Sequence, residues 1–200
     1  FTSGITMTPR CWTKGCKLGM SMRADIEEIL YTEEQLAEIV KNIGRRISAD
    51  YKDKNLFMVS VLKGSLIFMA DLMRAIDIPC SIDFLSVSSY GNGTSTSGAV
   101  RILKDLDSSM EGKDLLVVED ILDSGMTLSF LLKSLSARKP SSIRLCTLLD
   151  KPERRKVDIY PDYVGAVVPD KFIVGYGLDY AEKYRNLPYI GVLKPEVYTV

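Results

Sequence analysis

The segment over residues 115–128 constrains the fold of this chain more than any other part of it. It reads Leu-Leu-Val-Val-Glu-Asp-Ile-Leu-Asp-Ser-Gly-Met-Thr-Leu. An apolar run typical of a buried strand leads into two adjacent carboxylates, Glu119 and Asp120, and Asp123 follows shortly after. A turn of small residues then opens into an amphipathic stretch. Strand, acidic pair, turn and helix in this order predict a phosphate-binding turn beside carboxylates that can hold the diol of a sugar.

The turn at residues 124–127 has the chemistry of an anion-binding helix start. Successive backbone N–H groups point at one spot, the helix dipole adds positive potential, and the hydroxyls of Ser124 and Thr127 can donate. Gly125 lets an anion approach the backbone closely. The simpler alternative is that Asp123 or Ser124 only caps the helix. The adjacent acidic pair argues against it, because two close carboxylates repel each other unless magnesium or hydroxyl donors lie between them. GxxxxGK[ST] is absent, so this is not a Walker loop.

Composition excludes several functional classes. The chain has 200 residues, 46% apolar and 26% charged, as in a soluble globular protein. Lys plus Arg and Asp plus Glu both number 26, so the net charge is zero and nothing predicts binding to nucleic acid. Histidine is absent, which excludes imidazole bases, Ser-His-Asp triads and nearly all catalytic zinc sites. No apolar run approaches the ~20 residues of a membrane span, and no signal layout is present, so we expect a cytoplasmic protein without membrane contact.

The first part of the chain is poorly patterned. We expect a disordered leader or extension at residues 1–21, with Met20 or Met22 as the initiator, and a single domain at residues 22–200. The four cysteines are scattered without a CxxC pair, as Cys11, Cys16, Cys80 and Cys146. The first two lie in the leader, and the sequence leaves their redox state open. The other two stand in apolar surroundings and are expected in the core.

Hydrophobic spacing predicts strands that alternate with helices. Thr32 and Gln35 form a capping box before a helix whose apolar stripe reaches Ile47. Further helices are expected at residues 66–76 and 128–135, strands at 56–62, 81–88, 100–103, 115–118, 143–149, 163–168, 173–174 and 189–193, and a loose glycine-rich loop at 90–98. The alternation predicts an α/β fold with a parallel sheet and right-handed crossovers. Ligands of such sheets bind beyond the carboxyl ends of the strands, where Lys63 and Lys151 fall.

Residues 116–128 resemble the phosphoribosyl-pyrophosphate binding motif of the type I phosphoribosyltransferases, a hydrophobic strand followed by two acids and a D-[ST]-G-x-T turn. The resemblance implies that family's fold, a central, mainly parallel sheet flanked by helices with a small hood from the chain termini. It implies that Glu119 and Asp120 bind the ribose. The 5′-phosphate would be held by Asp123, Ser124, Gly125, Met126 and Thr127. Relatives often carry other residues at two of these positions, but backbone N–H groups do most of the binding. The motif does not indicate which base accepts the phosphoribosyl group.

Residues 169–180 resemble the purine-binding segment of the hypoxanthine–guanine phosphoribosyltransferases. They read Pro-Asp-Lys-Phe-Ile-Val-Gly-Tyr-Gly-Leu-Asp-Tyr. Phe172 offers a face to a planar base, Lys171 can donate to a carbonyl at the purine 6-position, and the backbone of Ile173 can bond the ring edge. By itself a Lys-Phe pair is more often a surface cation beside a core ring. The resemblance over the whole segment favours a 6-oxopurine site.

The resemblance to this family runs over about residues 26–198 and includes several shorter matches. The loop after the first predicted strand of the sheet resembles the pyrophosphate loop, whose often cis peptide exposes N–H groups, and implies a role for Lys63 and Gly64. Ser89 and Tyr90, before the glycine-rich loop, resemble the closing lid at the pyrophosphate. Arg185 matches the pyrophosphate-binding arginine.

Two further residues complete the implied site. Asp179 matches the family's second metal-associated acid and lies in the purine segment. Lys151 matches a lysine near the purine and near the essential acid, which is Asp123. The resemblance therefore implies magnesium as cofactor, with metal ligands Glu119, Asp120 and Asp179.

The function implied by the resemblance is purine salvage. The 5-phosphoribosyl group of phosphoribosyl pyrophosphate would pass to hypoxanthine or guanine, with Asp123 and Lys151 as catalytic residues and Asp123 as the proton acceptor. The family forms dimers and tetramers, so we expect a homodimer or a homotetramer. The preference among hypoxanthine, guanine and xanthine stays open.

Two other functions remain to be distinguished. One is a regulator with the same fold that binds nucleotide or RNA without important catalysis; the neutral chain and the complete set of site residues favour an enzyme. The other is a sister enzyme for adenine, orotate or uracil. A cationic donor such as Lys171 suits a 6-oxo acceptor and disfavours that alternative.

Overall fold

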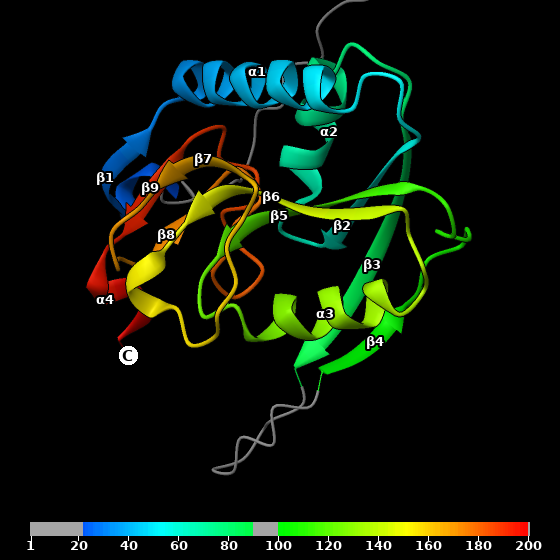
Figure 1. Ribbon diagram of the computed structural model, residues 1–200. Coiled ribbons are helices and arrows are strands. Elements are labelled where there is room, and N and C mark those ends of the chain that lie inside the picture. Colours follow the sequence, from blue (N-terminus) through cyan, green and yellow to red (C-terminus); the bar gives the residue numbers. More distant parts are fainter. Residues whose placement is uncertain (1–21, 90–99, 200) are drawn as a thin grey trace, which may run out of the picture.

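The computed structural model describes residues 22–89 and 100–199. A six-stranded sheet runs through the middle of the molecule and helices cover both of its faces (Figure 1). In chain order the elements are η1 (Met22–Asp25), β1 (Ile26–Tyr31), α1 (Glu33–Asp50), β2 (Leu56–Leu62), α2 (Leu66–Ala75), β3 (Ser81–Ser89), β4 (Val100–Lys104), β5 (Asp114–Leu122), α3 (Met126–Ser136), β6 (Ser142–Asp150), η2 (Pro152–Arg154), β7 (Tyr163–Val167), β8 (Ile173–Val174), β9 (Ile190–Leu193) and α4 (Pro195–Tyr198). The expectations for the leader, with Cys11 and Cys16, and for the lid at Tyr90 lie outside the described residues.

The main sheet has the strand order β4-β3-β2-β5-β6-β7. β4 is antiparallel to β3 and every other neighbouring pair is parallel, which confirms the mainly parallel α/β sheet. The chain passes from β2 through α2 to β3 in one direction and from β5 through α3 to β6 in the other. The order therefore reverses between β2 and β5, and the ligands of such sheets bind at that switch point.

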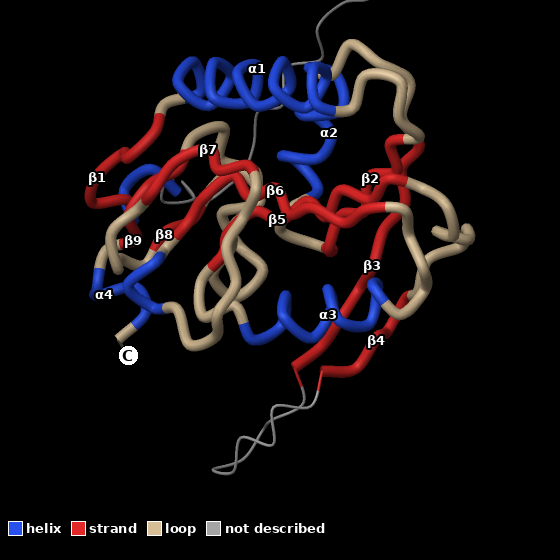
Figure 2. Tube along the Cα trace, viewed as in Figure 1, coloured by secondary structure: helices blue, strands red, loops and turns tan. Residues whose placement is uncertain are grey.

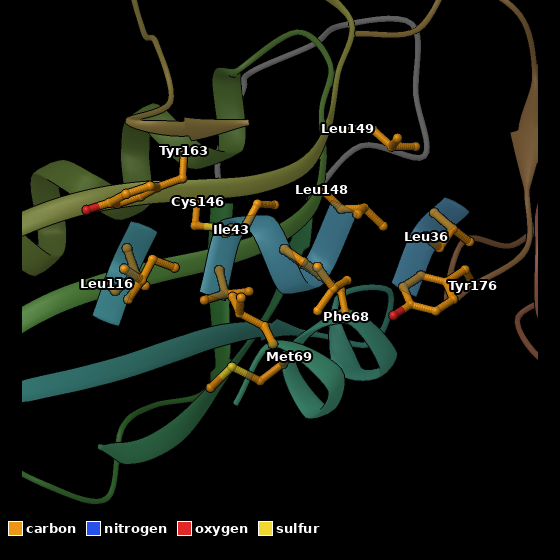
Figure 3. Packing of buried hydrophobic residues seen from close by; sticks show 14 of the residues in the cluster. Leu36, Ile43, Phe68, Met69, Leu116, Cys146, Leu148, Leu149, Tyr163 and Tyr176 are labelled. Carbon is orange, nitrogen blue, oxygen red and sulfur yellow. The ribbon is translucent and has the colours of Figure 1, made fainter. Parts of the chain in front are cut away.

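The two faces of the sheet bury different residues, because successive side chains of a strand point to opposite sides. In β5, Leu116 and Val118 pack into the core beneath α1 and α2, whereas Leu115 and Val117 pack into the core beneath α3. Figure 3 shows the first of these cores, where side chains of α1 and α2 meet those of β5 and β6. Burial on both faces explains the unbroken apolar run before the acidic pair.

Helix α1 begins as predicted. Thr32 Oγ1 accepts from the backbone N–H of Gln35 at 3.3 Å, and the Gln35 side chain accepts from the backbone N–H of Thr32 at 2.9 Å. Ile39 of the predicted apolar stripe is only partly buried, and the other four residues, Leu36, Val40, Ile43 and Ile47, are buried. Each of these side chains contributes about 1.5–3 kcal/mol on burial, so the stripe fixes α1 against the sheet.

A second, antiparallel sheet in the order β1-β9-β8 joins the two ends of the described chain beside the main sheet (Figure 2). This confirms the predicted hood. The sequence did not predict β1, because Glu27 and Glu28 interrupt its apolar pattern. Ile26 packs against Val174 and Leu193, so tertiary contacts hold the strand. Within the described ranges no helix combines the length and apolarity that crossing a membrane would need.

Strand β5 runs to Leu122, beyond the predicted end at residue 118, so the acidic pair lies inside the strand. After Val118 this strand no longer pairs with β2 and pairs with β6 alone, as far as Leu122 beside Asp150. β2 continues beside β3 to Leu62. One neighbour is enough to keep Glu119 and Asp120 extended, and the divergence of β2 leaves space next to them.

Candidate active site

Three loops leave the carboxyl ends of neighbouring strands at the switch point. Lys63 follows β2, Asp123 follows β5 and Lys151 follows β6, as predicted. Two cavities, of about 330 and 480 Å³, open beside these loops. Ile121, Asp123 and Asp179 line both of them, so the cavities adjoin. Asp123 therefore lies where ligands in the two cavities would meet.

Asp120 packs directly against the loop after β2. A Cβ atom on Gly64 would overlap with Asp120 Oδ2, so a larger residue there would displace the Asp120 carboxylate. Asp120 Oδ1 accepts a hydrogen bond from the backbone N–H of Ile121 at 2.8 Å, which orients the carboxylate. The Leu62–Lys63 peptide bond is cis, as the resemblance implied. The smaller cavity is thus bordered by backbone on one side and by the acidic pair on the other.

Both carboxyls of the acidic pair have raised pKa values. Burial, followed by the charge of Asp120, raises the pKa of Glu119 well above its ordinary value. Burial raises the pKa of Asp120 to about 6, against the opposing effect of backbone N–H donors and of Arg185. Glu119 Oε2 is buried and accepts no hydrogen bond from the described residues. A ligand that brings hydroxyl donors or a cation would satisfy this oxygen and stabilise the ionised forms.

The turn before α3 leaves the start of that helix open to a ligand. Gly125 is the N-cap residue and has a φ of 78°, a left-handed conformation that favours glycine, and no side chain caps the helix. Asp123 is therefore not a cap, and Ser124 only accepts from the backbone N–H of Met126 at 3.4 Å. Thr127 also lines the smaller cavity. First-turn N–H groups at the positive end of the helix dipole suit a phosphate.

Lys63 and Arg185 supply positive charge to the smaller cavity. Arg185 Nη2 lies 2.8 Å from Asp179 Oδ1, and its Nη1 donates to the carbonyl of Gly177 at 2.8 Å. Its Nε is buried and has no hydrogen-bond partner among the described residues. Lys63 Nζ lies 2.9 Å from Glu182 Oε2. Two cations thus converge on the cavity that holds the open helix start.

The larger cavity has an aromatic wall. Phe172 stacks on Tyr198 with ring centroids 4.8 Å apart and 22° between the planes, and Tyr180 meets Phe172 edge-on at 5.5 Å. Phe172 is 38% exposed, a high value for phenylalanine, and lines the cavity together with Ile173. An exposed, supported ring is suited to stacking on a planar ligand.

Lys151 brings a buried ammonium group to the same cavity. Its side chain is 7% exposed, and Nζ donates to the carbonyl of Lys171 at 2.9 Å and lies 3.6 Å from Asp170 Oδ1. The ammonium of Lys171 is turned to the hood instead, where Nζ lies 2.9 Å from Glu28 Oε2 and the side chain is 46% exposed. Both lysines line the cavity, but only the charge of Lys151 is enclosed.

Two comparisons with known proteins bear on this site. The chain matches the family described as "Phosphoribosyl transferase domain" over residues 26–181. It is 56% identical to the hypoxanthine-guanine phosphoribosyltransferase of Bacillus subtilis over 177 residues, which cover 88% of this chain and 98% of that protein. The chain belongs to the hypoxanthine–guanine phosphoribosyltransferase family.

A solved structure of one relative agrees with this chain in fold, and another relative is much longer than this chain. A crystal structure of a hypoxanthine phosphoribosyltransferase from Staphylococcus aureus has a TM-score of 0.87 and 53% identity, over 91% of this chain and 99% of that one. The bifunctional protein TilS/HprT of Listeria monocytogenes is 55% identical over 179 residues. These residues are 90% of this chain and 28% of that protein, so the chain spans little more than a quarter of the bifunctional relative.

Three residues at this site, Arg154, Glu182 and Tyr198, were not predicted from the sequence. Arg154 Nε lies 3.2 Å from Asp123 Oδ1 and its Nη1 lies 3.5 Å from Asp170 Oδ1. Asp123 Oδ1 is buried and makes no hydrogen bond within the described residues, so the charge of Arg154 is what this oxygen faces. Glu182 contacts Lys63 at the smaller cavity, and Tyr198 stacks on Phe172 at the larger one. Of the predicted residues, Ser89 is the last residue of β3, at the edge of the described range.

The side chains described in this structure do not by themselves supply enough ligands for a metal ion. In the described part of the chain no three Asp, Glu or Cys side chains are grouped to hold a metal ion. Asp179 contacts Arg185 through Oδ1 and accepts from the backbone N–H of Glu182 through Oδ2 at 2.9 Å. Glu119, with its unpartnered oxygen, and Asp120 remain. Magnesium usually takes one or two carboxylates together with substrate oxygens and water, so these residues fit magnesium when a phosphorylated substrate shares it.

Proposed function

We propose that this chain transfers the 5-phosphoribosyl group of phosphoribosyl pyrophosphate to hypoxanthine or guanine, giving IMP or GMP and pyrophosphate. The observation that carries the proposal is the pair of adjoining cavities with Asp123 at their junction. One cavity has an open helix start, cations and an acidic pair for a phosphorylated sugar. The other has an aromatic wall and a buried ammonium for a base. Relatives that the chain matches over nearly their whole length are named for this reaction.

The donor substrate is assigned to the smaller cavity. Glu119 and Asp120 accept hydrogen bonds from the ribose hydroxyls, which satisfies the unpartnered oxygen of Glu119. The turn from Asp123 to Thr127 holds the 5′-phosphate through its backbone N–H groups.

The diphosphate is assigned to Lys63, Gly64, Ser89, Tyr90 and Arg185. The buried, unused Nε of Arg185 supports this assignment.

The purine is assigned to the larger cavity, against Phe172 and beside the backbone of Ile173. We assign the hydrogen bond to the 6-oxo oxygen mainly to Lys151, because its ammonium is enclosed at the cavity whereas that of Lys171 pairs with Glu28. A buried charged donor discriminates strongly, since a base without the acceptor leaves one of the N–H groups of the Lys151 ammonium without its partner. Asp179 borders the purine on the side of the donor cavity.

The reaction at the anomeric carbon passes through an oxocarbenium-like state, as in glycoside hydrolysis. Both substrates must be held in line across the cavity junction, and positioning supplies much of the rate. Asp123 accepts the purine proton from its place at that junction, and Arg154 orients its carboxylate. Lys63 and Arg185 stabilise the charge of the departing diphosphate.

Magnesium is the cofactor we propose, with Glu119 and Asp120 as the residues that would hold it. Asp179, the third ligand that the resemblance implied, would first have to give up its contacts with Arg185 and with the backbone N–H of Glu182. When bound, magnesium would neutralise charge on the diphosphate and ribose oxygens. The unpartnered oxygen of Glu119, beside Asp120 at the wall of the smaller cavity, supports this assignment.

A purine panel tests the proposal. Phosphoribosyl pyrophosphate is incubated with hypoxanthine, guanine, xanthine or adenine, with and without magnesium, and nucleotide and pyrophosphate are measured. We expect IMP or GMP only with magnesium and little AMP. Binding of nucleotide without turnover of any purine would instead favour the regulatory alternative.

A further inference from the structure

Glu182 bridges the two cations of the smaller cavity. Lys63 Nζ lies 2.9 Å from its Oε2, and Arg185 Nη2 lies 3.4 Å from its Oε1. One carboxylate therefore uses both oxygens to neutralise the two side chains assigned to the diphosphate. The hydrogen bond and charge of Lys63, with a smaller contribution from Arg185, lower the pKa of Glu182, which keeps it ionised.

Glu182 lies in a tight turn whose backbone conformation is unfavourable for its side chain. The chain makes a tight turn in which Tyr180 and Lys183 exchange backbone hydrogen bonds of 3.2 and 3.0 Å. The central residues, Ala181 and Glu182, have φ values of 50° and 62°. Turns of this kind favour Asn-Gly, because other side chains resist positive φ. The backbone N–H of Glu182 donates to Asp179 Oδ2 at 2.9 Å, which ties the turn to the site.

Lys63 and Arg185, the two cations that Glu182 contacts, still have N–H groups that can donate to a ligand. Arg185 Nε is buried and has no hydrogen-bond partner among the described residues. Lys63 is largely exposed and has two further N–H donors on its ammonium. The ion pair between Lys63 and Glu182 is exposed at both ends, and such pairs are weak enough to be exchanged for a stronger anion.

We propose that Glu182 is an internal counter-anion, a positioning residue that holds Lys63 and Arg185 in the ligand-free protein and is displaced from them by the diphosphate group of the substrate or product. This rests on the proposed function, because it needs the diphosphate to bind these two side chains. The need to displace Glu182 reduces diphosphate affinity and favours release of pyrophosphate.

The test is calorimetric titration of the full chain with inorganic pyrophosphate at a fixed magnesium concentration. Glu182→Gln keeps the size of the side chain and removes its charge, and we expect it to bind pyrophosphate about three- to tenfold more tightly. The KM for phosphoribosyl pyrophosphate should fall in parallel while kcat does not rise. Glu196→Gln removes the same charge from α4, outside both cavities, and should change neither quantity.

A double-mutant cycle separates direct contact from long-range charge. In a chain that carries Lys63→Gln, the increase in pyrophosphate affinity caused by Glu182→Gln should be smaller, since one of the two cations that Glu182 contacts is then missing. An unchanged or weaker affinity in Glu182→Gln, or a gain of equal size in both backgrounds, overturns the proposal while pyrophosphate still binds the wild-type chain. Absence of pyrophosphate binding in the wild-type chain overturns the proposed function itself, and this proposal with it.

Discussion

Asp120 lies against Gly64 with a pKa of about 6, above the value of 3.8 for an ordinary aspartate. Between these two values the folded protein binds more protons than the unfolded chain. The free energy of unfolding contributed by this group therefore falls as pH rises from about 4 to 6. Asp120→Asn removes the charge at nearly constant shape, and should raise the stability of the ligand-free protein at pH 7 by up to about 3 kcal/mol.

Urea unfolding of the wild-type chain and of Asp120→Asn at pH 4 and pH 7 measures this effect. The variant should be clearly more stable at pH 7 and nearly equal at pH 4. It should also bind the donor substrate less well, because the ribose loses an acceptor. Equal stability at both pH values would contradict the assignment of a destabilising charge to Asp120.

Substitutions of the two lysines of the larger cavity, Lys151 and Lys171, are predicted to differ in their effect on nucleotide affinity. Lys151→Gln should weaken the binding of IMP about ten- to a hundredfold, as expected for loss of a buried charged donor. Lys171→Gln should cost less, since its ammonium pairs with Glu28. Calorimetric affinities for IMP and AMP give the comparison, because AMP lacks the 6-oxo group. Equal losses for both nucleotides, or a larger loss in Lys171→Gln, would sink this assignment.

Residue-level prediction from the sequence depended on local motifs. Glu119, Asp120 and Asp123 stand in one short segment, where the order of strand, acids and turn already indicates a phosphorylated sugar. Arg154 and Tyr198 belong to short terminal or connecting turns with no pattern of their own. Their roles arise from contacts across the fold, which spacing along the chain does not encode.

At the scale of elements, α3 presents its first turn to the smaller cavity. Thr127→Val removes a hydroxyl there at equal size, and should weaken binding of a 5′-phosphorylated nucleotide about tenfold without loss of stability. Ser129→Ala is the control, since it changes a hydroxyl of the same helix that does not line the cavity. Affinity for GMP and thermal unfolding of both variants check the prediction. A matching loss of affinity in Ser129→Ala would mean that the helix, and not the contact, was affected.

The sequence predicted most elements of the main sheet because each strand is buried on one or both faces and each helix carries an apolar stripe. It did not predict β1, whose two glutamates break the apolar pattern and whose pairing partner, β9, stands at the other end of the chain. It also ended β5 too early at residue 118. Glu119 and Asp120 have low intrinsic preference for strands, and the ladder to β6 overrides it.

At the scale of the whole molecule, ligand binding should stabilise the fold. A nucleotide at a hundredfold excess over its Kd adds about 2.7 kcal/mol to the free energy of unfolding. For a domain of this size the Tm should rise by about 5–10 °C with GMP or IMP. Thermal unfolding with and without nucleotide measures the shift, with CMP as the control. Equal shifts with CMP would contradict a purine site.

The two adjoining cavities are proposed to form one site for two substrates, with Asp123 acting at their junction. The most direct measurement is turnover by Asp123→Asn, with the affinities for GMP and phosphoribosyl pyrophosphate measured in the same preparation. We predict that turnover falls by ~10²-fold or more while both affinities stay within about threefold of the wild type. An unaltered turnover rate with intact binding would contradict a proton-accepting Asp123 at the junction.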